Sequence, residues 1–180
     1  MRIRKTKGTA VLTGNVVDSL KENSTTNAPS QRAVKEAVQN NIMTAFCKSR
    51  FSLDVPAQYT TYVLPLTDSI SCGDKLTFEN HRIKIGKGVS KVLVSGSIGL
   101  WNSPSTGEFG LQIHKNGNVR LNMAFSNHSG GEITGVNAVP VLAEVEEGDL
   151  ISLSISSAGT GTHNFLTDDK AVSLTVQVVD

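Results

Sequence analysis

Residues 89–117 alternate apolar and polar side chains with a period of two, and this feature constrains the fold more than any other. In the first half, two sets of side chains fall on opposite faces: Val92, Val94, Ile98 and Leu100 on one, and Leu93, Ser95, Ser97 and Trp101 on the other. This is the pattern of a β-strand with one buried face. A second alternating run ends at Asn116-Gly117, a dipeptide that favours a tight hairpin before a third strand.

Strand-like runs of this kind recur from residue 50 to the end and are separated by Gly, Asn, Asp and Pro. They cover residues 51–54, 59–66, 75–78, 81–86, 91–101, 108–115, 119–126, 133–145, 150–156 and 172–179. Many short strands with one apolar face are typical of an antiparallel β-sandwich. Pro140 inside one run predicts an edge strand or a bulge there. The fold class expected is mainly β, with a sandwich head over residues 49–180.

The first 48 residues have a different character. Residues 1–29 form a basic arm and a polar linker, and residues 30–48 predict an amphipathic helix capped by Ser30. The helix could pack on its own head, or it could form a parallel bundle with copies of itself. A polar residue on the apolar stripe fits a bundle better, because it can set register and strand number. The residues expected in this trimeric stalk are Val34, Val38, Asn41, Ile42 and Ala45.

Charge and composition exclude several partners. Residues 1–50 hold nine of the 17 Lys and Arg residues and three of the 16 acidic ones, so the head is acidic. The basic residues are scattered and lack interleaved aromatics, so nucleic-acid binding is not expected. No apolar run approaches the ~20 residues of a membrane span, and no signal-peptide core follows Met1. Cys47 and Cys72 lack metal-ligand spacing and predict free thiols of a protein made in a reducing cytoplasm.

No catalytic or metal-binding pattern is found. The four histidines show no pairing of the HxH or HxxxH kind, and no nucleophile elbow or phosphate loop is present. The acidic residues Glu144, Glu146, Glu147 and Asp149 predict a solvated turn, with a surface calcium site as the alternative. We therefore expect a protein that is not an enzyme and that carries no cofactor or metal.

Several motifs in order resemble a known fold family. They are Ile83-x-Ile85-Gly86-Lys87-Gly88-Val89, Val92-x-Val94-Ser95-Gly96-x-Ile98, Leu111-x-Ile113-x-Lys115-Asn116-Gly117 and Val145-x-x-Gly148-Asp149-x-Ile151-x-Leu153. Together they resemble the jelly roll of the tumour necrosis factor and complement globular-head superfamily, in the form found in phage tail proteins. Residues 14–38 resemble the linker and helix of tail-fibre and receptor-binding proteins of phages that infect Gram-positive bacteria.

These resemblances imply a function. They imply a homotrimer in the virion whose heads recognise a host cell-surface polysaccharide or teichoic-acid-like glycan, and whose basic arm contacts other tail or baseplate proteins. The alternative is a structural tail, neck or baseplate fibre component with no ligand of its own. A secreted cytokine-like ligand would suit the head, but not the lack of a signal peptide or the free cysteines.

Strand direction predicts where a ligand would bind. If the first and last strands of the head pair, the run 91–101 leads away from the stalk, and the turn 115–118 returns to it. The loops 102–108, 126–132 and 157–170 then lie at the distal end, where polar loops on a rigid scaffold favour binding. The candidate ligand-binding residues are Trp101, Asn102, Ser105, Asn127, His128, His163, Asn164 and Asp168.

Overall fold

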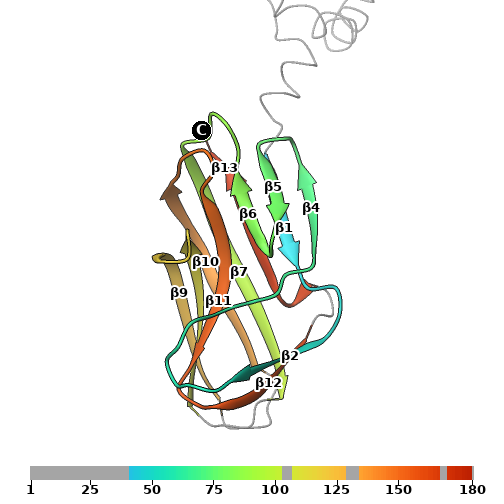
Figure 1. Cartoon of the computed structure of the whole chain (residues 1–180), viewed down its shortest axis with the longest axis vertical. Helices are drawn as coiled ribbons and strands as arrows, with labels where there is room; N and C mark the ends of the chain where they lie inside the picture. Colours follow the sequence, from blue (N-terminus) through green and yellow to red (C-terminus); the bar gives the residue numbers. More distant parts are fainter. Residues whose placement is uncertain (1–40, 103–106, 129–133, 167–169, 180) are drawn as a thin grey trace, which may run out of the picture. The chain divides into compact units, whose positions relative to one another are not determined.

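The computed structural model describes residues 41–102, 107–128, 134–166 and 170–179, and these form a sandwich of two antiparallel β-sheets (Figure 1). The basic arm, the linker and most of the predicted helix, including Val34 and Val38, lie outside the described residues. Within the described residues, no helix is long and apolar enough to cross a membrane.

The first sheet contains seven strands. Its hydrogen-bonded order is β2-β12-β7-β13-β1-β4, and β10 pairs with β7 as well. The bounds of these strands are β1 Ile42–Phe46, β2 Phe51–Val55, β4 Asp68–Cys72, β7 Lys91–Asn102, β10 Thr134–Glu144, β12 Gly161–Leu166 and β13 Ser173–Val178.

The second sheet contains six strands. Its order is β5-β6-β11-β8-β9, with the short β3 beside β11. The bounds are β3 Tyr62–Val63, β5 Leu76–Glu79, β6 Arg82–Ile85, β8 Gly107–Lys115, β9 Val119–His128 and β11 Leu150–Ser157.

The core lies between the two sheets and follows the alternation of the sequence. In β7, the buried side chains are those that the period of two predicts: Val92, Val94, Ile98 and Leu100. Leu111 and Ile113 from β8 face them from the other sheet, with no exposed area. Gly96 leaves room for the other sheet, because a Cβ added there would stand 2.7 Å from Leu153 Cδ1.

The hairpin and the bulge expected from the sequence are both confirmed. Asn116 and Gly117 have φ angles of 55° and 77°, which is the left-handed pair that a tight hairpin requires. They join β8 to β9, which pair antiparallel. In β10 the register against β7 shifts between Ala138 and Val141, across Pro140. A proline cannot donate to the ladder, so the strand bulges there.

The prediction that the helix extends to residue 48 is wrong. Residues Ile42–Phe46 form β1, which pairs with β13 on one side and β4 on the other. Ile42 and Ala45 therefore belong to the sandwich and not to a stalk, and Ala45 is fully buried in its core. The side chain of Asn41 is not on a helical seam either. Its Oδ1 accepts hydrogen bonds from the backbone N–H groups of Asp74 and Lys75, each at 3.0 Å.

The two ends of the sandwich differ in what they carry. At one end, the backbone N–H of Val178 donates to the carbonyl of Asn41 (2.8 Å), and that of Val179 donates to Lys91 (3.2 Å). The hairpin turn after β8 lies at this same end, where the Lys115 ammonium donates to the carbonyl of Glu144. β7 runs from this end to the opposite one, which we call the distal end (Figure 1). This is the direction that the sequence predicted.

Candidate functional site

The distal end holds some of the predicted ligand-binding residues. Asn102 ends β7 and His128 ends β9, where His128 pairs with Gly107, and the structure describes their backbone only. Asn127 is exposed on β9. Ser105 and Asp168 lie outside the described residues.

His163 is not a surface residue, so its place in the predicted site is wrong. The sequence predicted one long loop over residues 157–170, but residues Gly161–Leu166 form β12, between β2 and β7. The His163 side chain points into the sandwich with 0% exposure. Its ring lies 5.5 Å from the ring of Phe109 between centroids, at an angle of 49°. Alternation along β12 buries His163 and Phe165 and leaves Asn164 on the outer face.

Trp101 is the aromatic residue among the predicted ligand-binding residues, and its side chain is exposed at the distal end. Leu100 before it is buried in the core, and Trp101 points out of the first sheet with 44% of its surface exposed. The guanidinium carbon of Arg50 lies over the indole, 5.8 Å from the ring centroid. A cation at this distance is attracted by the negative face of the ring. The pair brings a charge and a flat apolar surface together on the outside of the sheet.

Ser52 and Asn164 lie on the same outer face, opposite each other in the β2–β12 pair. The Ser52 hydroxyl donates to Asn164 Oδ1 at 2.6 Å. Asn164 is in turn opposite Asn102 in the β12–β7 pair, one residue beyond Trp101. The bond from Ser52 therefore orients the Asn164 amide, on the strand next to the end of β7 that carries Trp101. Together, Arg50, Ser52, Trp101 and Asn164 form what we call the Trp101 surface.

An apolar strip leads from Trp101 along the outer face of the sheet. A Cβ added at Gly99 would stand 3.1 Å from the Ala171 Cβ and 3.3 Å from that of Leu166, so these two side chains cover the glycine. Phe46 is the last residue of β1 and lies opposite Ser173 in the β1–β13 pair. The Lys170 ammonium stands over the Phe46 ring, 5.3 Å from its centroid. The outer face thus carries two aromatic rings, each with a cation over it.

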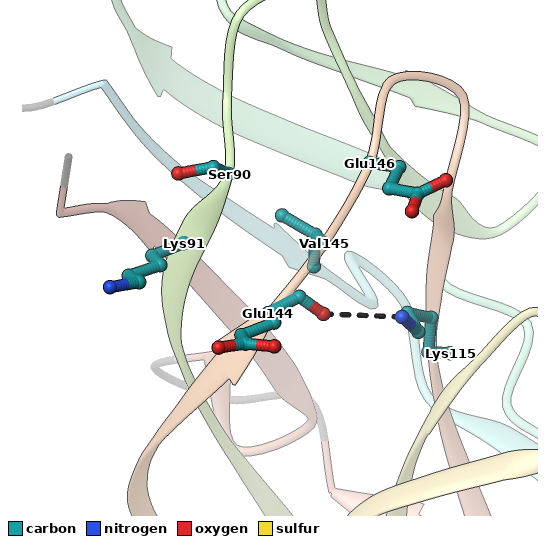
Figure 2. A pocket seen from close by; sticks show the side chains of 6 residues that line it. All are labelled: Ser90, Lys91, Lys115, Glu144, Val145 and Glu146. Atoms are coloured by element: carbon teal, nitrogen blue, oxygen red, sulfur yellow. Dashed lines mark hydrogen bonds between the residues drawn. The ribbon is translucent and has the colours of Figure 1, made fainter.

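A polar pocket of about 430 Å³ lies at the opposite end, near Asn41 and Val178 (Figure 2). Its lining residues are Ser90, Lys91, Lys115, Glu144, Val145 and Glu146. Lys115 Nζ lies 3.4 Å from Asp149 Oδ2, and Asn116 Nδ2 donates to Asp149 Oδ1 at 2.7 Å. The backbone N–H of Glu146 completes the set with a bond of 2.9 Å to Asp149 Oδ2.

These contacts change the chemistry of the acidic turn. Burial acts to raise the pKa of Asp149, but the hydrogen bonds from Glu146 and Asn116 and the charge of Lys115 outweigh it and hold that pKa below its ordinary value. The carboxylate oxygens are thus bonded within the protein. Among the described residues, no group of three or more His, Cys, Asp and Glu side chains is placed to hold a metal ion. The geometry supports a hydrogen-bonded turn.

Arg50 and Ser52 are the residues that the sequence alone did not reveal. Ser52 alternates with Phe51 and Leu53, so its outward direction was predictable from the period of two. Its neighbour Asn164 could not be predicted, because the segment that forms the partner strand β12 was expected to be a loop. Arg50 precedes β2, and only the pairing of β2 with β12 brings it to the indole.

The fold and site can now be compared with known proteins. The chain has the antiparallel jelly-roll sandwich of the tumour necrosis factor type. Murine APRIL at pH 5.0 is similar to it with a TM-score of 0.60 at 10% identity, over 78% of this chain and 99% of that one. Eiger TNF from S. frugiperda is similar with a TM-score of 0.58 at 9% identity, over 78% of this chain and 94% of that one. No protein-family model matches the sequence, and no curated protein matches it. At such identities the likeness shows the fold alone.

Proposed function

We propose that this protein is the receptor-binding head of a phage or prophage tail, a homotrimer that attaches the virion to a bacterial cell-surface saccharide. The observation that carries the proposal is the Trp101 surface, which lies at the end of the sandwich away from Asn41. An exposed indole with hydroxyl and amide groups beside it suits the mixed apolar and polar faces of a sugar. The proposed role is binding, and it includes no catalytic step.

The outer face of the first sheet supports self-association. Three strands in its middle present uncharged side chains there: Ile42 and Thr44 from β1, Ser173, Thr175 and Gln177 from β13, and Leu93, Ser95 and Ser97 from β7. Hydroxyl pairs bridge the strands, with 2.9 Å between Thr44 and Thr175 and between Ser97 and Ser173. These hydroxyls bond to one another, so a flat partner can cover them at little cost in lost hydration.

A complementary surface lies on the adjoining edge of the sandwich. Large apolar side chains are exposed on β9 and β10, including Phe125 at 50%, Leu142 at 58% and Val139 at 73%. Apolar side chains gathered on one edge mark a contact surface. We propose that this edge packs on the uncharged sheet face of the next copy. Because the two patches differ, the contact is head-to-tail and closes into a ring, which fits the trimer that the resemblance implies.

The assembly is tested by the mass of the protein in solution. We expect light scattering to give three times the 19.2 kDa chain mass. Leu142→Asp places a charge against an apolar partner and should yield monomers, whereas Lys87→Asp, at an exposed site elsewhere, should leave the trimer intact. A monomeric wild type at micromolar concentration would contradict the trimer.

The adhesion role is tested by binding to whole cells. Fluorescently labelled protein should bind a host strain from a panel of Gram-positive bacteria and bind its purified wall polysaccharide. Trp101→Ala should abolish this binding with an unchanged melting temperature. A stable trimer that binds no strain and no polysaccharide would contradict adhesion and favour the alternative, a structural tail, neck or baseplate component.

A further inference from the structure

We propose that the outer face of the second sheet carries a separate binding site for the carboxylate or phosphate group of a ligand, formed by Arg82, His114, Ser152 and Ser154. We call these residues the Ser152 row. The inference goes beyond the proposed adhesion role, because it concerns another face of the sandwich and does not depend on the Trp101 surface.

The Ser152 row is placed by strands β6, β11 and β8, which are neighbours in the second sheet. Ser152 on β11 lies opposite His114 on β8, and Ser154 follows two residues later on the same face. β6 pairs with the other edge of β11, and its register brings Arg82 level with Ser152. Ile151, beside Ser152, is fully buried in the core, so alternation directs the side chains of the row out of the opposite face.

The polar atoms of the Ser152 row are buried without a hydrogen-bond partner. Ser152 and Ser154 have at most 1% of their surface exposed, and His114 has 7%. The atoms left without a partner are Ser152 Oγ, Ser154 Oγ, His114 Nδ1 and Arg82 Nε. Buried polar groups are almost always hydrogen-bonded in folded proteins, because leaving one unpaired is costly. Several such atoms beside one another therefore mark a place where the polar atoms of a ligand would bind.

The neighbouring part of the same face shows what a complete set of bonds looks like. Gln112, opposite Ser154, donates from its Nε2 to Ser156 Oγ at 2.9 Å. The hydroxyl of Thr61 donates to Gln112 Oε1 at 3.5 Å. The hydrogen bonds of this face thus reach Gln112 from the distal side, and the unpaired atoms begin beside it. A network that is satisfied on one side only gains stability when a ligand completes it.

The charge of Arg82 indicates the kind of ligand. Glu79 lies opposite Arg82 in the β5–β6 pair, but its carboxylate binds Lys84, whose Nζ lies 3.4 Å from Oε1 and 3.5 Å from Oε2. The Nε–H of Arg82 has no acceptor in the part of the chain that the structure describes. A guanidinium only donates hydrogen bonds, and its strongest partners are the oxygens of carboxylates and phosphates.

The other members of the row are neutral and can bond the remaining oxygens of such a group. Burial and the charge of Arg120 lower the pKa of His114, so its ring is neutral at neutral pH. A neutral imidazole has one donor and one acceptor nitrogen, and each serine hydroxyl can act in both ways. Arg120 lies opposite His114 in the β8–β9 pair and adds a second positive charge to this face.

The Ser152 row is separate from the contact proposed between copies. That contact uses the outer face of the first sheet and the edge that carries Phe125, Val139 and Leu142, whereas the row lies on β6, β11 and β8 of the second sheet. Arg82 is half-buried, so part of its side chain is in contact with solvent. We expect this side chain to shift when the ligand enters, since rotamer changes are common at binding surfaces.

The experiment is a titration of the isotope-labelled full-length protein, followed by the NMR signals of the His114 imidazole. The probes are sodium phosphate, sodium D-glucuronate and D-glucose, at constant pH and with ionic strength held constant by sodium chloride. We expect saturable shifts with phosphate or D-glucuronate and none with glucose, and the anion that binds more tightly identifies the group. If neither anion gives a saturable shift, or if glucose shifts the signals equally, the inference is overturned.

Variants of Arg82 test the charged contact. Arg82→Gln should weaken binding of the anion at least about tenfold, which corresponds to about 1.4 kcal/mol. Arg82→Lys should recover only part of this loss, because an ammonium lacks the paired donors of a guanidinium. Lys87→Gln removes an exposed charge outside the row and should have no effect. If Lys87→Gln weakens binding as much as Arg82→Gln, the attraction is unspecific and the inference fails.

Ser152→Ala separates a ligand-binding role from a structural one. Because Ser152 Oγ has no partner within the protein, its removal should leave the melting temperature unchanged or raise it. The same change should weaken binding of the anion severalfold. A lower melting temperature would show that the hydroxyl already has a partner, and unchanged affinity in both Ser152→Ala and Arg82→Gln would place the anion elsewhere; each result overturns the inference. None of these outcomes bears on adhesion, which is tested with whole cells.

Discussion

Replacing Asn41 with alanine tests whether this residue belongs to the head or to a helical seam. In the structure, Asn41 Oδ1 accepts two backbone hydrogen bonds, from Asp74 and Lys75, at 3.0 Å each. Gly73, with φ of +87°, leaves room for the Asn41 amide, because a Cβ there would collide with it. The side chain therefore fastens the turn after β4 to the start of β1.

The magnitude follows from the two bonds. Each net hydrogen bond contributes about 1 kcal/mol, so Asn41→Ala should lower the free energy of unfolding by about 2 kcal/mol. For a domain of this size, that corresponds to a melting temperature lower by roughly 6 °C. Asn41→Asp keeps the acceptor oxygen and should lose less. Urea unfolding followed by tryptophan fluorescence measures both.

The opposite outcome has a clear meaning. On the apolar seam of a helical bundle, a buried asparagine costs stability, so replacing it with an apolar residue raises stability and relaxes the number of strands. If Asn41→Ala is as stable as the wild type or more so, and its mass in solution changes, the two hydrogen bonds are not what holds this residue, and the placement of Asn41 beside the turn after β4 is wrong.

Three further predictions concern the core, the thiols and the acidic turn. Phe165→Ala should destabilise the sandwich by about 3–5 kcal/mol, since a fully buried ring stacked 4.6 Å from Phe51 is lost, and a change below 1 kcal/mol in urea unfolding would contradict this packing. Cys72 is exposed and should react quickly with a thiol reagent. Cys47 is buried, and burial raises its pKa to about 12, so it should react only after unfolding. Two fast-reacting thiols, or a disulfide detected by mass, would refute this. The folded pKa of Asp149 is below its ordinary value of 3.8, so its ionised form stabilises the fold above that value, and the stabilisation is lost as the pH falls through the folded pKa. Asp149→Asn should therefore be less stable than the wild type at neutral pH, with a difference that shrinks in acid, and a constant difference would contradict the role of the charge.

The central strands of the sandwich could be predicted from the sequence because their own residues define them. β7 has a buried apolar residue at most alternate positions, so its faces are visible without any knowledge of its neighbours. The Asn116-Gly117 turn is equally local, because its backbone angles are those that these two residues adopt easily.

β1 and β12 could not be predicted in the same way, because distant contacts define them. Ile42, Ala45 and Phe46 fit a helical stripe and a strand equally well, and pairing with β4 and β13 decides between them. In β12 the inward residues are His163 and Phe165, and a histidine in an inward position hides the alternation. Tertiary contacts override local preference in both cases.

The candidate site shows the same division. That Trp101 would sit near the distal end followed from the direction of one strand, which is local information carried along the chain. The residues that lie near Trp101 could not be predicted, because Arg50 and Asn164 come from segments far apart in the sequence. His163 was misplaced for the same reason: a polar residue was taken as a sign of a loop.

The position of β1 inside the sheet determines how the head would bear a mechanical load. Chain that precedes Asn41 continues directly into β1, which is bonded along both edges, to β13 and to β4. A pull between this point and a ligand held at Trp101 would pass from β1 through β13 to β7, the strand that carries the indole. The bonds between these strands lie across the direction of the pull and share the force, so they must break together and not one after another. A sandwich pulled in this way would resist being torn open, because several strand pairs carry the load at once.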